Sequence, residues 1–315
     1  MSQNIAILIG NTEYTEFSTL SCCANDVHQM HELLSATNKF SRIMDYIDRP
    51  VDVVKDELRA LADSDDGYEE VFVYFSGHGL SNSDDFFMCF SDFKEASPNT
   101  TGLSRNDAFE LIRQFKAELS VVVIDACEAG RNLIKGHVNP LSSTLKTGFS
   151  NFVQFSSCTE RQFSLAGKRI SLFTDEFIKA CLNKEQGSIY YSDVESALRD
   201  AFLSHPSQTP HFIRQGTSQE KFCTDAANLK SFREVYLTAP ISDEGAIVEP
   251  LITPFALAKN AIENINALVP TKDQAQNFIN SVFDSVLNNS EKTPEVTDFF
   301  EVRIVNYDDF ELVQN

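Results

Sequence analysis

The stretch VFVYFSGHG at residues 71–79 decides the fold, together with the later run VVVIDACEAG at residues 121–130. Each is a short β-branched and aromatic run that ends in small residues, which is typical of a buried parallel strand. The first run delivers His78 at its carboxyl end, and the second delivers Cys127. Because open parallel sheets place their chemistry at the carboxyl ends of their strands, we expect the imidazole and the thiol to face one crevice. A thiol beside an imidazole indicates a cysteine nucleophile with its base.

Strand-like and helix-like segments alternate along the first two thirds of the chain. Such alternation predicts right-handed crossovers and an α/β fold with a mostly parallel sheet sandwiched by helices. Expected strands outside the two runs cover residues 4–9, 42–47, 86–90, 151–156 and 211–213. Expected helices cover residues 24–36, a segment opened by Pro50, 105–116 with Ser104 as its cap, 171–182 and 192–203.

The length of 315 residues allows two domains, and a hydrophobic fraction of 42% supports a sizeable core. The alternation stops near Cys223, so we predict one domain over 1–225 and a smaller, mainly helical or α+β region over 226–315. In that C-terminal region, amphipathic patterns predict helices over 254–268 and 273–287, and a weak alternation predicts an edge strand over 299–305.

The charge balance bears on the class of partner. The chain has 26 Lys and Arg against 46 Asp and Glu, so its net charge of −20 repels nucleic acids and anionic lipids and favours cationic peptides. Its first residues enter a strand pattern directly, and no apolar run has the length of a membrane span, so we expect a cytoplasmic protein without a membrane partner.

The cysteine pattern argues against a disulfide framework. There are seven cysteines, an odd number, with no CxxC pair and no neighbouring His/Cys cluster, so we expect reduced thiols and no metal site. Most of them are predicted to be packing residues, because a buried thiol behaves as a small hydrophobe.

Cys127 needs a partner to act as a nucleophile. A thiol with an ordinary pKa of about 8.5 is mostly protonated at neutral pH, and His78 can take its proton. In peptide cleavage the same imidazole would protonate the departing amine, while the backbone N–H groups of Gly79 and Cys127 would hold the oxyanion. Glycines beside His78 would let a substrate backbone come close.

The two motifs also resemble a known family. SGHG at residues 76–79 and DACEAG at residues 125–130, with histidine about 50 residues before cysteine, are similar to the motifs of caspase-like cysteine peptidases. The likeness is closer to the metacaspase and bacterial caspase-family branch than to animal caspases, and it covers about residues 1–222. It implies the caspase-haemoglobinase fold and endopeptidase activity.

A third segment implies the substrate class. LSCCAND at residues 20–26 resembles the family element whose acidic residue, here Asp26, lines the pocket for the side chain just before the cut bond. By the same resemblance, Cys23, Ser76 and Asp125 would complete this pocket. Two carboxylates in a narrow pocket favour an arginine or lysine and penalise an acidic side chain. The resemblance therefore implies protein or peptide substrates cut after Arg or Lys.

Residues 128–149 lack clear periodicity and predict a long loop beside the site. Related enzymes often mature by cutting this loop, so Arg131, Lys135 and Lys146 are candidate self-cleavage positions.

Calcium activation is another trait of metacaspases. Asp84, Asp85 and Asp92 could supply oxygen ligands, but the chain has no EF-hand spacing, so our primary expectation is that no cofactor is needed.

Two other functions are open at this stage. One is a catalytically silent scaffold that binds proteins through its acidic C-terminal region, and the other is acyl or amide transfer by the same thiol. We further expect a monomer and an activating protein partner that binds the C-terminal region, and the family resemblance implies a role in regulated proteolysis such as antiviral defence or cell suicide.

Overall fold

We describe a computed structural model of the full chain. It describes residues 3–63, 67–81, 85–127, 148–159, 162, 164–167, 169–238, 249–250, 300–306 and 309–314. The chain divides into two compact units, Met1–Leu251 and Ile252–Asn315. In these described ranges, no helix is both long enough and apolar enough to cross a membrane.

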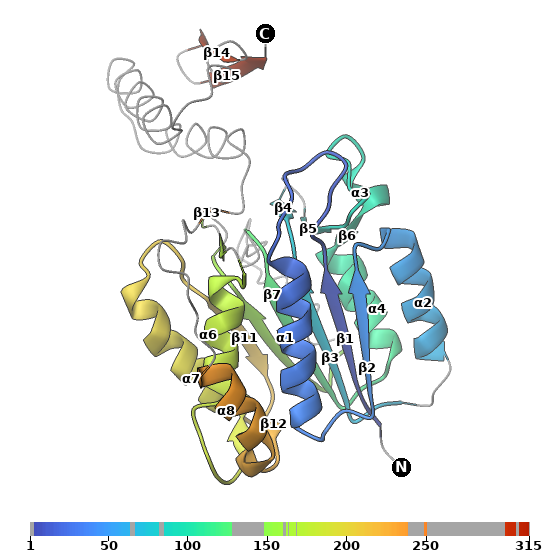
Figure 1. Cartoon of the computed structure of the whole chain (residues 1–315). Helices are drawn as coiled ribbons and strands as arrows, with labels where there is room; N and C mark the ends of the chain where they lie inside the picture. Colours follow the sequence, from blue (N-terminus) through green and yellow to red (C-terminus); the bar gives the residue numbers. More distant parts are fainter. Residues whose placement is uncertain are drawn as a thin grey trace. The chain divides into compact units, whose positions relative to one another are not determined.

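A six-stranded sheet forms the centre of the first unit (Figure 1). Its strands, in spatial order, are β11 (His211–Gln215), β8 (Asn151–Ser156), β7 (Leu119–Asp125), β3 (Glu70–Ser76), β1 (Asn4–Gly10) and β2 (Arg42–Ile47). Five strands run parallel, and β11 pairs antiparallel with β8 at one edge. The predicted mostly parallel sheet is thus confirmed.

The central strands alternate between two cores. In β3, Val71, Val73 and Phe75 belong to one core, whereas Phe72 and Tyr74 belong to the other. Every residue of β3 and β7 is buried, as expected for strands covered on both faces.

Helices cover both faces of this sheet (Figure 1). The core containing Val71 is closed by α2 (Val51–Asp63) and α4 (Arg105–Gln114). The opposite core is closed by α1 (Cys23–Ala36), α6 (Leu172–Cys181) and α7 (Tyr191–Ala201). Ser104 caps α4 by accepting a hydrogen bond from the backbone N–H of Asp107, as the sequence predicts.

Smaller elements complete the first unit. A three-stranded sheet follows the end of β3 and consists of β4 (Gly79–Ser81), β5 (Phe86–Cys89) and β6 (Gly102–Ser104). The short helix α3 (Pro98–Thr101) lies between β5 and β6 in the chain. Two short antiparallel pairs join β10 (Ile189–Tyr190) to β12 (Lys221–Cys223) and β9 (Leu165–Ala166) to β13 (Glu249–Pro250). Two 3₁₀ turns, η1 (Phe202–Ser204) and η2 (Ala226–Leu229), and the helix α8 (Lys230–Thr238) follow α7 in the chain.

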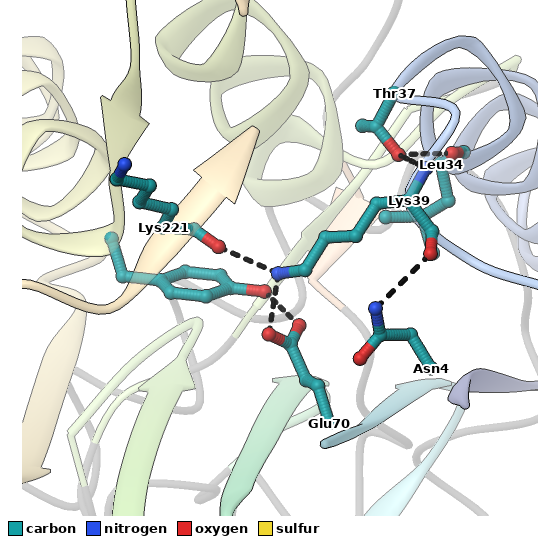
Figure 2. A network of polar contacts seen from close by, with 7 residues as sticks. Asn4, Leu34, Thr37, Lys39, Glu70 and Lys221 are labelled. Carbon is teal, nitrogen blue, oxygen red and sulfur yellow. Dashed lines mark hydrogen bonds and ion pairs between the residues drawn. The ribbon is translucent and has the colours of Figure 1, made fainter. Parts of the chain in front are cut away.

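A partly buried polar network ties together the amino-terminal ends of the central strands (Figure 2). The Lys39 ammonium forms an ion pair with Glu70 at the start of β3 and donates to the Lys221 carbonyl at 2.6 Å. The Tyr191 hydroxyl donates to Glu70 at 2.6 Å, and the Asn4 amide donates to the Lys39 carbonyl at 3.2 Å. The network therefore joins β1 and β3 to the segments after α1 and around β12, at the sheet end opposite to His78.

The second unit contains one described hairpin, β14 (Phe300–Asn306) paired antiparallel with β15 (Asp309–Gln314). The strand expected over 299–305 corresponds to β14. The helices expected over 254–268 and 273–287 lie outside the described residues.

Candidate active site

His78 and Cys127 follow two neighbouring strands at the same edge of the sheet. Strands β3 and β7 pair in parallel with Ser76 opposite Asp125, and each candidate lies two residues beyond its strand end. The Gly77 N–H donates to the Asp125 carbonyl at 3.2 Å, which continues the pairing past the strands. Both side chains are buried, with residue exposures of 4% for His78 and 3% for Cys127. The expected convergence of these two segments at one sheet edge is therefore observed.

Gly79 lies directly against the backbone of Cys127. A Cβ atom at position 79 would come within 2.4 Å of the Cys127 carbonyl oxygen and 2.6 Å of the Phe86 ring. Since real Cβ atoms do not approach backbone so closely, a residue with a side chain would push the two segments apart. The glycine thus lets the segment after His78 reach Cys127.

An aromatic and carbonyl cage orients the His78 ring. The Tyr14 ring meets it edge-on at 4.7 Å between centroids, and the Phe17 ring lies 5.3 Å away. His78 Nε2 lies 2.8 Å from the Ser18 carbonyl oxygen. Because a carbonyl oxygen can only accept, this contact assigns the proton to Nε2 and leaves Nδ1 as the basic nitrogen of the neutral ring.

The backbone of His78 is held as well. Its N–H donates to the Tyr14 hydroxyl at 2.9 Å, and its carbonyl accepts from the Cys89 N–H at 3.0 Å. The imidazole is therefore positioned by both its ring and its main chain, as a catalytic base requires.

Asp26 and Asp125, the predicted pocket acids, are both completely buried. Asp26 lies in the first turn of α1 and accepts from the Ser76 hydroxyl at 2.8 Å and from the Ser171 N–H at 2.9 Å. Asp125 accepts from the hydroxyl groups of Ser164, Ser171 and Thr174. Ser171, the N-cap of α6, thus contacts both carboxyl groups.

Burial changes the acidity of this pair. The pKa of Asp26 is raised from 3.8 to about 8, mainly by burial and then by the neighbouring Asp125 carboxylate, against the effect of the donors Ser171 and Ser76. Burial also raises the pKa of Asp125, while its three hydroxyl donors oppose the shift. Among the described residues, no Lys or Arg forms an ion pair with either carboxyl group. A cation entering this site would therefore stabilise both carboxylates.

Cys23, the remaining predicted pocket residue, lies beside these groups. Its thiol, the Cys22 thiol and a carboxylate oxygen of Asp26 lie within 4.8 Å of one another, a grouping that could hold a metal ion. A hydrogen bond with Cys22, and then burial, raises the pKa of Cys23. Both Asp26 oxygens also accept protein donors, and the absence of a metal stays a prediction.

Two of the three candidate calcium ligands have other partners. Asp85 accepts from the N–H of Phe86 at 2.8 Å and lies 3.9 Å from Arg105, and Asp92 accepts from the N–H of Val51 at 3.2 Å. Asp84 lies outside the described residues, and the expectation that no calcium is needed stays a prediction. The self-cleavage candidates Arg131, Lys135 and Lys146 also lie outside the described residues.

The sequence did not predict several residues around the site. The hydroxyls of Ser164, Ser171 and Thr174 hold Asp125, and the Ser18 carbonyl orients His78. A serine directly before a helix is a common N-cap, so the local sequence indicated that role for Ser171. Its contact with Asp26 joins residues 145 positions apart and has no local sequence pattern.

Comparison with known proteins identifies the family. The sequence model of the caspase-domain family matches residues 3–220, which include β3, β7 and both candidate catalytic residues. The chain belongs to the caspase-domain family.

Two individual relatives agree with this assignment. A paracaspase of Dictyostelium discoideum is 24% identical over 191 residues, which cover 59% of this chain and 45% of that protein. The chain thus aligns with less than half of that relative. The crystal structure of protein GSU0716 from Geobacter sulfurreducens covers 70% of this chain and 99% of its own, with a TM-score of 0.53 and 17% identity, and shows that the two share the fold. Helix α8 of the present caspase-family protein follows the matched residues.

Proposed function

We propose that this chain is a cysteine endopeptidase that uses Cys127 and His78 to cut protein substrates after Arg or Lys. The observation that carries the proposal is the delivery of His78 and Cys127 by the paired ends of β3 and β7, beside two buried carboxyl groups without a cationic partner in the described chain. Family membership supports the peptidase class, and the buried pair supports the basic substrate.

His78 Nδ1 takes the proton of the Cys127 thiol, and the sulfur attacks the carbonyl carbon of the scissile peptide. The N–H groups of Gly79 and Cys127 donate to the resulting oxyanion. The imidazolium then protonates the departing amine, which leaves a thioester on Cys127. His78 next takes a proton from a water molecule that attacks the thioester, and the freed carboxylic acid leaves as the thiolate recovers.

The Ser18 carbonyl supports this proton transfer. Its contact with Nε2 keeps the proton on that nitrogen and stabilises the imidazolium when Nδ1 is protonated. A backbone carbonyl thereby takes the orienting position that a carboxylate occupies in many other triads.

Asp26 and Asp125 select the substrate side chain. An arginine guanidinium offers several N–H donors in a planar fork and retains its charge, so it can satisfy carboxylate oxygens on both residues. A lysine ammonium supplies the charge without the fork. A substrate aspartate would add a third carboxylate to a buried acidic pair, which costs free energy.

Fluorogenic peptide amides ending in Arg, Lys or Asp test the proposal. We expect the Arg peptide to be cleaved faster than the Lys peptide, and the Asp peptide not to be cleaved. The Cys127→Ala variant should be inactive. The control variant Cys181→Ala, which removes a buried thiol at the end of α6, should retain the activity. Absence of cleavage by the parent chain would favour the scaffold function, and transfer to an added amine without hydrolysis would favour acyl transfer.

A further inference from the structure

Helix α8 contacts both ends of α6, although it lies beyond the residues that match the caspase domain. The Tyr236 hydroxyl donates to Asp175 Oδ1 at 2.8 Å in the first turn of α6. Arg233 Nε donates to the carbonyl of Leu182, the C-cap of α6, at 3.0 Å, and its guanidinium also donates to the carbonyl of Lys184. Two side chains of one helix thus hold the two ends of another.

The amino-terminal turn of α6 is the part that holds the acidic pair. Ser171 donates its N–H to Asp26 and its hydroxyl to Asp125, and Thr174 donates its hydroxyl to Asp125 at 2.8 Å. The Asp175 N–H donates to the Ser171 carbonyl at 3.0 Å. Asp175 therefore connects the Tyr236 hydroxyl to the turn that orients both carboxyl groups.

The contact between Tyr236 and Asp175 is well defined. The Tyr236 ring stacks on Phe232 at 5.4 Å between centroids, and Lys179 pairs with the other Asp175 oxygen at 2.7 Å. Burial raises the pKa of Tyr236 and the neighbouring Asp175 carboxylate raises it further, so its hydroxyl keeps the proton that it donates.

A pocket of ≈ 120 Å³ lies beside this contact. Its walls come from α1, α6, α8 and the segment before α6, and they include Asn25, Arg169, Asp175, Phe232 and Tyr236. The Asn25 amide donates to the Arg169 carbonyl at 2.8 Å, so α1, which carries Asp26, is also tied to the segment that leads into Ser171. The hydroxyl contact of Tyr236 links α8 directly to the first turn of α6.

We propose that Tyr236 and Arg233 of α8 are positioning residues for the acidic pocket, acting through Asp175 and the ends of α6. This inference rests on the proposed function for its kinetic consequence. His78 and Cys127 are delivered by β3 and β7 and not by α6, so loosening α6 should weaken the binding of a basic side chain more than it slows the chemical step.

The kinetic test compares Tyr236→Phe and Arg233→Gln in the full chain. We expect KM for an Arg peptide to rise about 5- to 30-fold with kcat changed less than about twofold, which is the range of losing one charge-assisted hydrogen bond. Leu237→Ala is the matched control, because Leu237 lies on the same helix and is 53% exposed. A loss confined to kcat, or parent kinetics in both variants, would overturn the inference.

A second measurement does not depend on peptidase activity. Hydrogen exchange of the backbone amides of residues 169–175 should become faster in Tyr236→Phe and Arg233→Gln, but not in Leu237→Ala, with the sheet amides of β3 and β7 unchanged. Unchanged exchange over residues 169–175 in both variants would overturn the positioning role even if activity fell. If the parent chain cuts no Arg peptide but the two variants exchange faster over residues 169–175, the proposed specificity is rejected and the positioning role of α8 stands.

Discussion

Ser171 donates hydrogen bonds to both Asp26 and Asp125, two buried carboxyl groups that lie 99 positions apart in the sequence and belong to different elements. One capping serine therefore fixes the position of both acids. Asp125 ends β7, and Asp26 accepts from Ser76, which ends β3, so the pair lies at the same end of the central strands as His78 and Cys127. If the acids bind a substrate side chain as proposed, the adjoining peptide bond would lie near the thiol.

Replacing His78 tests the proposed proton transfer. We expect His78→Ala to reduce kcat for an Arg peptide by about 10²- to 10⁴-fold, the usual contribution of a general acid and base. His205→Ala is the control, since His205 lies after η1 and is not part of the site. Retention of full activity in His78→Ala would refute the assignment.

The two pocket acids should determine selectivity. We expect Asp26→Asn to lower kcat/KM for an Arg peptide by about 10- to 100-fold, because a neutral amide loses a charge-assisted hydrogen bond and cannot accept the guanidinium fork as well. Asp200→Asn, on the exposed side of α7, serves as the control. An unchanged ratio of Arg to uncharged substrates in Asp26→Asn would contradict the pocket assignment.

The raised pKa of Asp26 predicts a pH dependence of stability. In the folded chain this carboxyl holds its proton up to a pKa of about 8, whereas the ordinary value is 3.8. Folding therefore takes up a proton between these values, and the stabilisation present below 3.8 is lost as the pH rises to about 8. Urea unfolding should show the free energy of unfolding of the parent falling relative to Asp26→Asn over this window, and parallel curves for the two proteins would contradict the shift.

The same pKa predicts that substrate binding releases a proton. A bound guanidinium favours the charged carboxylate, so Asp26 loses its proton when an Arg side chain enters. We expect an Arg peptide to bind the Cys127→Ala variant more tightly as the pH rises towards about 8, the pKa of Asp26 in the free protein. Titration calorimetry in buffers of different ionisation enthalpy measures the released proton, and no release at pH 7 would argue against the model.

Self-processing gives a test by mass. We expect the purified parent chain to be cut after Arg131, Lys135 or Lys146, and the Cys127→Ala variant to stay intact. Intact-mass spectrometry distinguishes these outcomes. A parent chain that remains whole while it cleaves Arg peptides would show that maturation is not required.

The Lys39–Glu70 network should matter for stability and not for catalysis. Lys39→Met leaves Glu70 buried without its cation, so we expect a loss of about 3–5 kcal/mol in the free energy of unfolding. Burial raises the pKa of Glu70 even with Lys39 in place, which shows how poorly this position tolerates a charge. Denaturant unfolding measures the loss, and Lys230→Met, which replaces an exposed lysine, is the control. At low temperature, where the variant stays folded, kcat should be unchanged, because the network lies at the opposite end of the strands from His78.

Much of the fold could be predicted from local patterns. The parallel strands β3 and β7 have strong β-branched runs, and their ends in small residues predicted where His78 and Cys127 would lie. The antiparallel direction of β11 could not be inferred, because a short strand has no sequence signal for direction.

Other features depended on contacts between distant residues. Helix α8 was not predicted, although Phe232, Val235 and Tyr236 have helical spacing, because none of its residues is fully buried and its side chains bridge to α6. The hydroxyls of Ser164 and Thr174 were not predicted to hold Asp125 for the same reason: serine and threonine are common surface residues, and only the folded chain brings them to a buried acid.

The position of α8 also bears on where this protein can be shortened. A fragment trimmed at residue 220, where the family match ends, would keep the imidazole and the thiol but lose both Arg233 and Tyr236. If α8 positions the acidic pair as proposed, such a fragment should bind basic ligands more weakly than the full chain, and inhibitor screening should then use the full chain.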